Sequence, residues 1–261
     1  MRRAEVGLIG GTGLESLLER AERVNVGTPY GLPSALLLGE VDERGVAFIP
    51  RHGLHHTIPP HRINYRANIY ALHRLGVRRV IATNAVGAIN PNYRPGDLVV
   101  PHDFIDFTKL RRLTFYDGAP VTHIDLSQPY CPEIRSLLID AAKKQQAVRV
   151  WDRSVLVCTE GPRFETPAEI EMFRRLGCDI VGMTGVPEAV LARELEMCYA
   201  TLCFVSNMAA GMQRRLTAHE VVETAEKCMP VIRRILREVV TRLPQERRCP
   251  CARALRDARL R

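Results

Sequence analysis

The sequence predicts a single α/β domain in which a large, mixed, curved and barrel-like sheet is flanked by helices. Short apolar runs alternate along the chain with longer segments of helical period, the pattern expected of an α/β domain. Eight of the apolar runs have the composition of strands, which is enough for a closed or strongly curved sheet. The 261 residues, 46% of them hydrophobic, can also build one sizeable core.

The expected elements follow one another along the whole chain. Strands are expected at residues 5–10, 34–41, 45–51, 79–85, 97–104, 154–161, 179–184 and 199–207. Helices are expected at residues 62–76, 131–146, 166–177, 187–197 and 217–243. The third helix has the clearest ends, because Thr166, Pro167 and Glu169 form a start signal and Gly177 a stop signal.

The basic charge is concentrated near the C-terminus. We place one domain at residues 1–245 and a basic tail containing Cys-Pro-Cys at residues 246–261, where much of the net charge of +8 lies. The tail has no aromatic residue and no nucleic-acid motif accompanies it, so an anionic small substrate is a better explanation of the charge than nucleic acid. No apolar run suits a signal peptide or a membrane span, and a cytoplasmic location without membrane partners is expected.

The eight cysteines do not form the framework of a small secreted protein. Cys158, Cys178, Cys198 and Cys203 lie in apolar or amphipathic segments, where they are expected to be core residues. Cys249 and Cys251 in the tail have two interpretations that the sequence leaves open. They form a redox-active or disulfide-bonded pair, or they stay unpaired.

Polar side chains stand at the ends of six expected strands, where ligand sites of α/β sheets gather. These residues are Thr12, Arg51, His52, Asn84, Glu160, Arg163, Glu165, Thr184, Ser206 and Asn207. The turn GLIGGTGLES can present backbone N–H groups and Thr12 to an anion, although a tight turn without ligand is the alternative. A dinucleotide fingerprint would need glycine where Ser16 stands.

Two further segments indicate the kind of ligand. Arg51 and His52 suit an oxyanion such as phosphate, and no HExxH or cysteine pair completes a metal site in their histidine-rich loop, so no metal is expected. Phe164 and Glu165 precede a helix start, where the helix dipole alone could explain the carboxylate. They also suit a planar heterocycle, since Phe164 can stack on the ring and Glu165 can accept from its N–H group.

The motifs GGTG, RHGxxH with NYRANI, TNAVGAI, EGPRFET and GMTGVPEAVLARE occur in this order between Gly7 and Leu243. Together they resemble the trimeric purine nucleoside phosphorylases, especially the methylthioadenosine phosphorylase branch. The resemblance implies the nucleoside phosphorylase fold and reversible phosphorolysis, in which phosphate displaces a purine from ribose. It implies no cofactor, and inorganic phosphate would be a co-substrate.

The resemblance also implies roles for individual residues. The catalytic residues would be Asn207, Glu165 and His52. Phosphate would be held by Thr12, Arg51, His52, Asn84, Ala85 and Thr184, although relatives often have threonine where Asn84 stands. The nucleoside would contact Phe164, Glu165, Met183, Asn207, Met208, Ala209, His123, Ala218 and His219. His123 would reach the neighbouring subunit's pocket, which implies a homotrimer or a dimer of trimers.

The base preference depends on three positions. The adenine-using branch is expected to have aspartate at the positions of Asn207 and Ala209 and a small hydroxyl residue at that of Glu165, and this sequence departs at all three. Glu165 and Asn207 resemble the pair of the 6-oxopurine enzymes, so inosine and guanosine are expected substrates. One alternative is that the substrate is 5′-methylthioinosine or 5′-methylthioadenosine. A methylthio group would fit if Ala218 faces the ribose 5′ end, whereas His219 there would suit a hydroxyl. The other alternative is a nucleoside- or nucleic-acid-binding module without catalysis.

Overall fold

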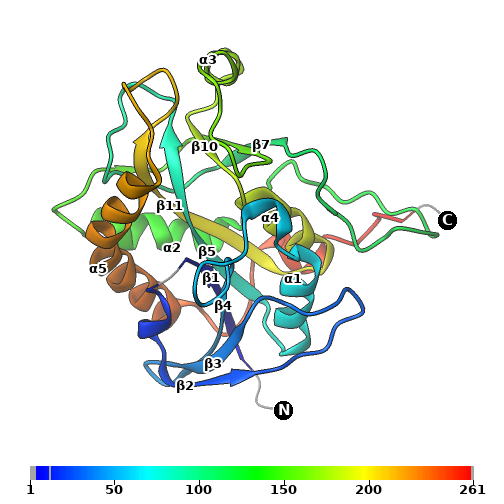
Figure 1. The fold of residues 1–261 in the computed structure, drawn as a ribbon. Coiled ribbons are helices and arrows are strands. Elements are labelled where there is room, and N and C mark those ends of the chain that lie inside the picture. Colours follow the sequence, from blue (N-terminus) through cyan, green and yellow to red (C-terminus); the bar gives the residue numbers. More distant parts are fainter. Residues whose placement is uncertain (1–3, 12, 260–261) are drawn as a thin grey trace.

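The computed structural model describes residues 4–11 and 13–259. Within them one sheet forms the centre of the molecule, with the strand order β2-β3-β4-β1-β5-β10-β9-β7 and with β11, β6 and β8 branching from β5 (Figure 1). The strands are β1 (Val6–Gly10), β2 (Glu19–Val24), β3 (Leu36–Val41), β4 (Arg44–Pro50), β5 (Arg79–Ala88), β6 (Leu98–Val99), β7 (Asp103–Phe107), β8 (Val150–Trp151), β9 (Val155–Thr159), β10 (Ile180–Gly182) and β11 (Cys198–Met208). The expected single-domain α/β architecture is confirmed, but the sheet is not closed.

Strands β1, β4, β5 and β11 form the parallel centre of the sheet, and antiparallel pairs lie on either side. For example, β3 is antiparallel to β4, and β10 is antiparallel to β5. The sheet is therefore mixed, as expected. The expected strand at residues 97–104 is instead divided into β6 and β7, and the short strands β2 and β8 were not predicted.

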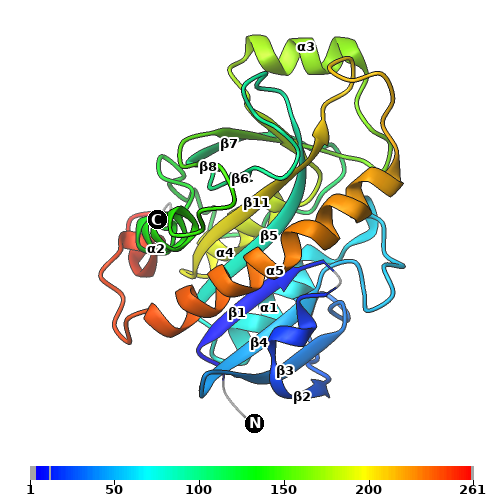
Figure 2. The same cartoon turned by 90° about the vertical axis from the view of Figure 1, so that its left-hand side faces the viewer.

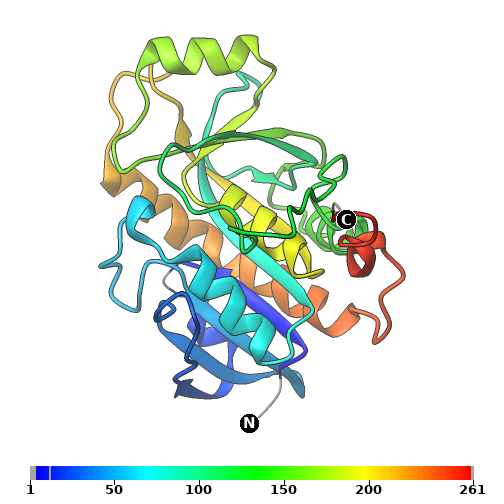
Figure 3. The ribbon, with the colours of Figure 1, turned by 90° about the vertical axis from the view of Figure 1, so that its right-hand side faces the viewer.

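Helices cover the sheet on both sides. They are α1 (Tyr65–Arg74), α2 (Pro132–Lys143), α3 (Pro167–Arg175), α4 (Gly185–Glu194) and α5 (Ala218–Arg242), with short 3-10 helices η1 (Glu15–Leu17), η2 (Pro60–Arg62) and η3 (Pro250–Arg253). Helix α5 crosses one face beside β1, β5 and β11 (Figure 2), and α1 and α4 lie on the other (Figure 3). None of the described helices is long and apolar enough to cross a membrane.

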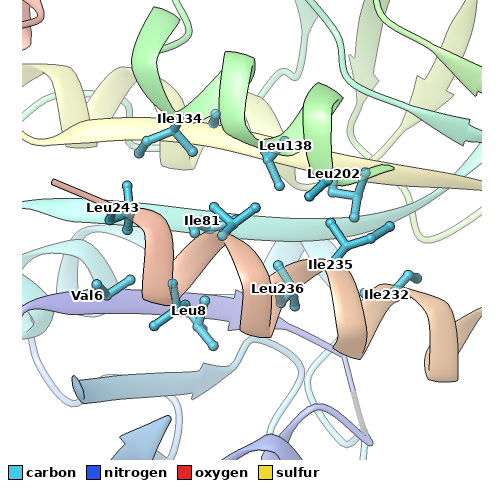
Figure 4. Close-up of a cluster of buried hydrophobic side chains, with 14 of the residues drawn as sticks. Val6, Leu8, Ile81, Ile134, Leu138, Leu202, Ile232, Ile235, Leu236 and Leu243 are labelled. Atoms are coloured by element: carbon cyan, nitrogen blue, oxygen red, sulfur yellow. The ribbon is translucent and has the colours of Figure 1, made fainter. Parts of the chain in front are cut away.

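The core is densest between α5, α2 and the central strands. Ile232, Ile235 and Leu236 of α5 are fully buried against strand residues such as Ile81 and Leu202 (Figure 4). This packing follows from the amphipathic pattern of α5, whose apolar residues recur at helical spacing. The capping box of Thr217 and Glu220 fixes the start of the helix, after the loop that follows β11.

The C-terminal segment packs on the same core. Cys249 and Cys251 are buried members of the cluster that contains α5 and α2, and the segment lies beside α2 in Figures 2 and 3. The Ala258 carbonyl accepts a 2.7 Å hydrogen bond from the His123 backbone N–H. The division of the chain at residue 245 stays a prediction, and the described part of the tail is ordered against the body.

Candidate active site

Parallel strands bring the expected phosphate residues to one edge of the sheet. The ends of β1 and β4 are paired at Gly10 and Pro50, and the Arg51 N–H donates to the Gly10 carbonyl at 3.0 Å. A Cβ atom on Gly10 would lie 2.8 Å from Thr83 Oγ1, so the close approach of β1 to β5 requires glycine. Thr12, predicted to bind phosphate, lies outside the described residues.

Arg51 is held by a buried carboxylate. Its Nε and Nη2 atoms donate to the two carboxylate oxygens of Glu188 at 2.6 and 2.8 Å, and its Nη1 donates to the Thr83 carbonyl at 2.9 Å. Burial alone would lower the pKa of Arg51, but Glu188 raises it above the usual value. A guanidinium has five N–H donors, so two of them remain for an anion. The Arg51 guanidinium is therefore held in one orientation before any ligand binds.

His52 is a neutral imidazole near pH 7. Burial and the adjacent Arg51 cation lower the pKa of His52 to about 4. Its Nδ1 lies 2.8 Å from the Ile58 carbonyl, which only accepts, so Nδ1 carries the proton in the neutral ring. Nε2 is then an acceptor that can receive a hydrogen bond from a protonated phosphate oxygen.

Asn84 and Thr184 are linked by a hydrogen-bond chain. Thr184 Oγ1 donates to Asn84 Oδ1 at 2.8 Å, and Asn84 Nδ2 donates to Thr201 Oγ1 at 2.7 Å. Thr184 immediately precedes α4, and its side chain makes no capping hydrogen bond to that helix. An anion here would lie at the positive end of the helix dipole. Ala85 is the single exposed residue of β5, next to Asn84.

A second group of residues surrounds Glu165. The residue is 9% exposed, its carboxylate accepts from Thr159 Oγ1 at 2.6 Å, and burial raises the pKa of Glu165. Phe164 beside it is 37% exposed, as a stacking surface requires. Met183 packs against the turn that leads to this pair of residues, because a Cβ atom on Gly161 would meet its Sδ at 2.6 Å.

Asn207 stands directly after a β-bulge. Val205 is paired with Val86 and Asn207 with Gly87, so Ser206 is the extra residue that redirects the strand end. Asn207 Nδ2 donates to the Met208 carbonyl at 2.9 Å, and Asn207 Oδ1 accepts from Ser206 Oγ at 2.6 Å. Because a carbonyl only accepts, this contact defines which side of the amide is nitrogen and leaves its second N–H for a ligand.

Packing brings the Asn207 and Glu165 segments together. A Cβ atom on Gly211 would lie 2.8 Å from Pro167 Cβ, two residues after Glu165. In the residues that follow Asn207, Met208 is half-buried and Ala209 is buried. The structure therefore places the amide and the carboxylate, which are far apart in the sequence, on neighbouring segments.

Three predicted substrate residues are not enclosed within a single chain. His123, Ala218 and His219 are all exposed, and His219 pairs instead with Glu223, with 3.2 Å between Nδ1 and Oε1. Their predicted contacts with the nucleoside stay predictions.

The sequence analysis missed Glu188, the partner of Arg51. This carboxylate is fully buried in α4 and also accepts from the Tyr199 hydroxyl at 2.8 Å. The signal available was a single acidic residue inside the apolar stretch GVPEAVL, because a buried carboxylate requires a cation or several donors.

The described residues thus include a buried guanidinium held by Glu188, and a buried carboxylate and a buried amide on neighbouring segments. The family model described as the Phosphorylase superfamily matches residues 5–241. The chain therefore belongs to the phosphorylase superfamily, which confirms the family inferred from the motifs.

Curated relatives of this chain carry different substrate names. It is 50% identical to a probable 6-oxopurine nucleoside phosphorylase of Korarchaeum cryptofilum, covering 97% of this chain and 98% of the relative. It is 52% identical to a probable S-methyl-5′-thioinosine phosphorylase of Methanopyrus kandleri, again over 97% and 98%. A crystal structure of a methylthioadenosine phosphorylase from an Antarctic soil metagenomic library is similar, with a TM-score of 0.93, 35% identity and coverage of 100% of this chain and 93% of that one.

Proposed function

We propose that this enzyme catalyses the reversible phosphorolysis of purine ribonucleosides and prefers the 6-oxopurines inosine and guanosine. The products are the free base and ribose 1-phosphate, and inorganic phosphate is the co-substrate. The base preference is argued from two buried groups on neighbouring segments, the Glu165 carboxylate and the oriented Asn207 amide.

The donors and acceptors of this pair complement a 6-oxopurine. Such a base carries N1–H, which Glu165 can accept, and O6 and N7, to which the second N–H of Asn207 can donate. Adenine would instead present the N1 lone pair to a carboxylate. That arrangement leaves buried polar groups unpaired at about 1–3 kcal/mol each, so adenosine is expected to be the poorer substrate.

The two halves of the site serve opposite charges in the reaction. Cleavage of the glycosidic bond builds positive charge on the ribose and negative charge on the departing base. Phosphate bound by Arg51 and the start of α4 supplies the nucleophile and the counter-charge for the ribose. An amide hydrogen bond to O6 or N7 stabilises the base as it leaves, with no covalent enzyme intermediate.

The enzyme is also proposed to be a homo-oligomer, a trimer or a dimer of trimers. Leu110 and Val121 are 86% and 51% exposed on the segment that carries His123. A neighbouring subunit would cover these apolar side chains and receive His123 at its nucleoside site.

A second candidate substrate has the same base and a ribose with a 5′-methylthio group in place of the 5′-hydroxyl. The similarity to the Methanopyrus kandleri relative named as a thioinosine phosphorylase favours 5′-methylthioinosine as an alternative. In addition, His219 is engaged by Glu223, so it is not committed to a ribose 5′-hydroxyl within the single chain.

Steady-state phosphorolysis of inosine, guanosine, adenosine, 5′-methylthioinosine and 5′-methylthioadenosine tests both proposals. A higher kcat/KM for inosine than for adenosine supports the 6-oxopurine preference, and the reverse order would overturn it. The ratio of methylthioinosine to inosine then decides the sugar preference independently. Release of base without added phosphate would contradict phosphorolysis itself.

A further inference from the structure

Four cysteines from three separate parts of the chain meet in one buried cluster. They are Cys131 at the start of α2, Cys198 at the start of β11, Cys249 just before η3 and Cys251 within it. Their sulfur atoms all lie within 4.8 Å of one another, and none of these side chains is more than 9% exposed. We propose that this cluster is a structural tetrathiolate metal site, with zinc as the preferred ion.

The distances suit metal coordination. Zinc binds thiolates at about 2.3 Å in tetrahedral sites, which places neighbouring sulfurs about 3.8 Å apart. The Cys198 and Cys249 sulfurs are 3.3 Å apart, well beyond the roughly 2.05 Å of a disulfide bond. All four cysteines are free thiols in the structure. A small adjustment of the side chains would therefore complete a tetrahedron.

The donor set also selects the kind of ion. Four sulfur ligands favour zinc or iron over the oxygen-preferring ions magnesium and calcium. The site is closed, because four thiolates fill a tetrahedral shell and leave no position for a substrate. The ion would thus stabilise the fold and would take no part in phosphorolysis. The sequence analysis expected no metal, and this proposal revises that expectation for a structural ion only.

The surroundings can stabilise the charge that coordination creates. Binding of Zn²⁺ by four thiols releases up to four protons and leaves a site with a charge near −2. Arg79, which is paired with Cys198 across β5 and β11, is a buried cation beside it. Its guanidinium donates to the Gln245 and Glu246 carbonyls, just before the tail cysteines, and its Nε has no hydrogen-bond partner among the described residues.

The site would fasten the C-terminal segment to the body of the protein. Cys249 and Cys251 belong to that segment, whereas Cys131 and Cys198 belong to the central fold. Beyond the cysteines, the segment pairs with the chain near His123, through the Thr122–Arg259 bridge and the Ala258 carbonyl. Loss of the ion is therefore expected to loosen the segment that supports His123.

Elemental analysis of the full chain, purified in reducing buffer without a metal-affinity step, tests the proposal. We expect about one zinc ion per chain. The double variant Cys249→Ser with Cys251→Ser should lose at least 90% of this metal and should melt at a lower temperature. Cys228→Ser is the matched control, because Cys228 is buried in the same core outside the cluster, and it should retain the metal.

Two measurements on the unaltered chain keep the test decisive even when the double variant fails to fold. Native mass spectrometry should show the added mass of the metal, and after acid has removed the metal the chain should have the mass expected for reduced cysteines. Replacement by cobalt should produce the visible spectrum of a tetrahedral tetrathiolate. Stoichiometric iron would support the site and change the assigned ion. Disulfides within the cluster, or reduced thiols that take up neither zinc nor cobalt, would overturn the proposal.

Discussion

Arg51 and Glu188 form a buried bidentate ion pair, with N–O distances of 2.6 and 2.8 Å, at the proposed phosphate site. Removing one charge of such a pair leaves the other buried and uncompensated. Glu188→Gln should therefore destabilise the protein by about 3–5 kcal/mol. In a chain of this size that loss lowers the melting temperature by roughly 10 °C.

Differential scanning calorimetry with and without phosphate checks this prediction. Phosphate should recover part of the lost stability in the variant, because the anion then neutralises Arg51. Glu171→Gln is the matched control, since Glu171 makes exposed ion pairs within α3 and should change stability by less than about 0.5 kcal/mol. Equal melting temperatures for the two variants would contradict the importance of the buried pair.

His52 should make the protein less stable in acid. Its pKa is lowered to about 4 in the folded state, against about 6.5 in an unfolded chain. The unfolded state then binds more protons between these values, so stability falls as the pH decreases from about 6.5 to about 4. Thermal melts over this range should show a smaller decline for His52→Gln, and an identical decline would refute the assignment.

Glu165 is expected to favour activity at the expense of stability. Burial raises its pKa, so its unfavourable contribution to folding grows as the pH rises through that pKa. Glu165→Gln should raise the melting temperature at neutral pH. It should also lower kcat/KM for inosine about tenfold, because a charge-assisted hydrogen bond to N1–H becomes a neutral one. A variant that is fully active would show that the carboxylate does not contact the base.

Asn207→Asp should shift the base preference toward adenine. An aspartate can accept from the 6-amino group of adenine but cannot donate to O6 unless it is protonated. We expect the ratio of kcat/KM for inosine to that for adenosine to fall at least tenfold, measured by phosphorolysis of both nucleosides. If the ratio is unchanged while activity falls, Asn207 has only a structural role.

His123 should act across a subunit boundary. His123→Ala and Glu165→Ala should each reduce activity when prepared alone. In oligomers assembled from equal amounts of both variants, about a quarter of the sites would combine an intact Glu165 with an intact neighbouring His123. Activity of the mixture well above the mean of the two separate variants supports this arrangement, and activity equal to that mean argues against it.

Much of the fold followed from local patterns in the sequence. The five helices were predicted within a few residues, because their apolar residues recur at helical spacing and signals such as Thr166 and Pro167 mark their ends. The strands β2 and β8 were missed since they are an exposed, polar edge strand and a two-residue strand with little apolar pattern.

The sequence by itself determined the family, through motifs whose order spans the chain, and the residue types available at the strand ends. Only the tertiary structure decided which of these groups are partners. The bulge at Ser206, the burial of Glu188 beside Arg51 and the meeting of four distant cysteines all depend on register and packing between segments far apart in the chain. Local residue patterns do not encode such long-range contacts, because they form only when the sheet and its helices assemble.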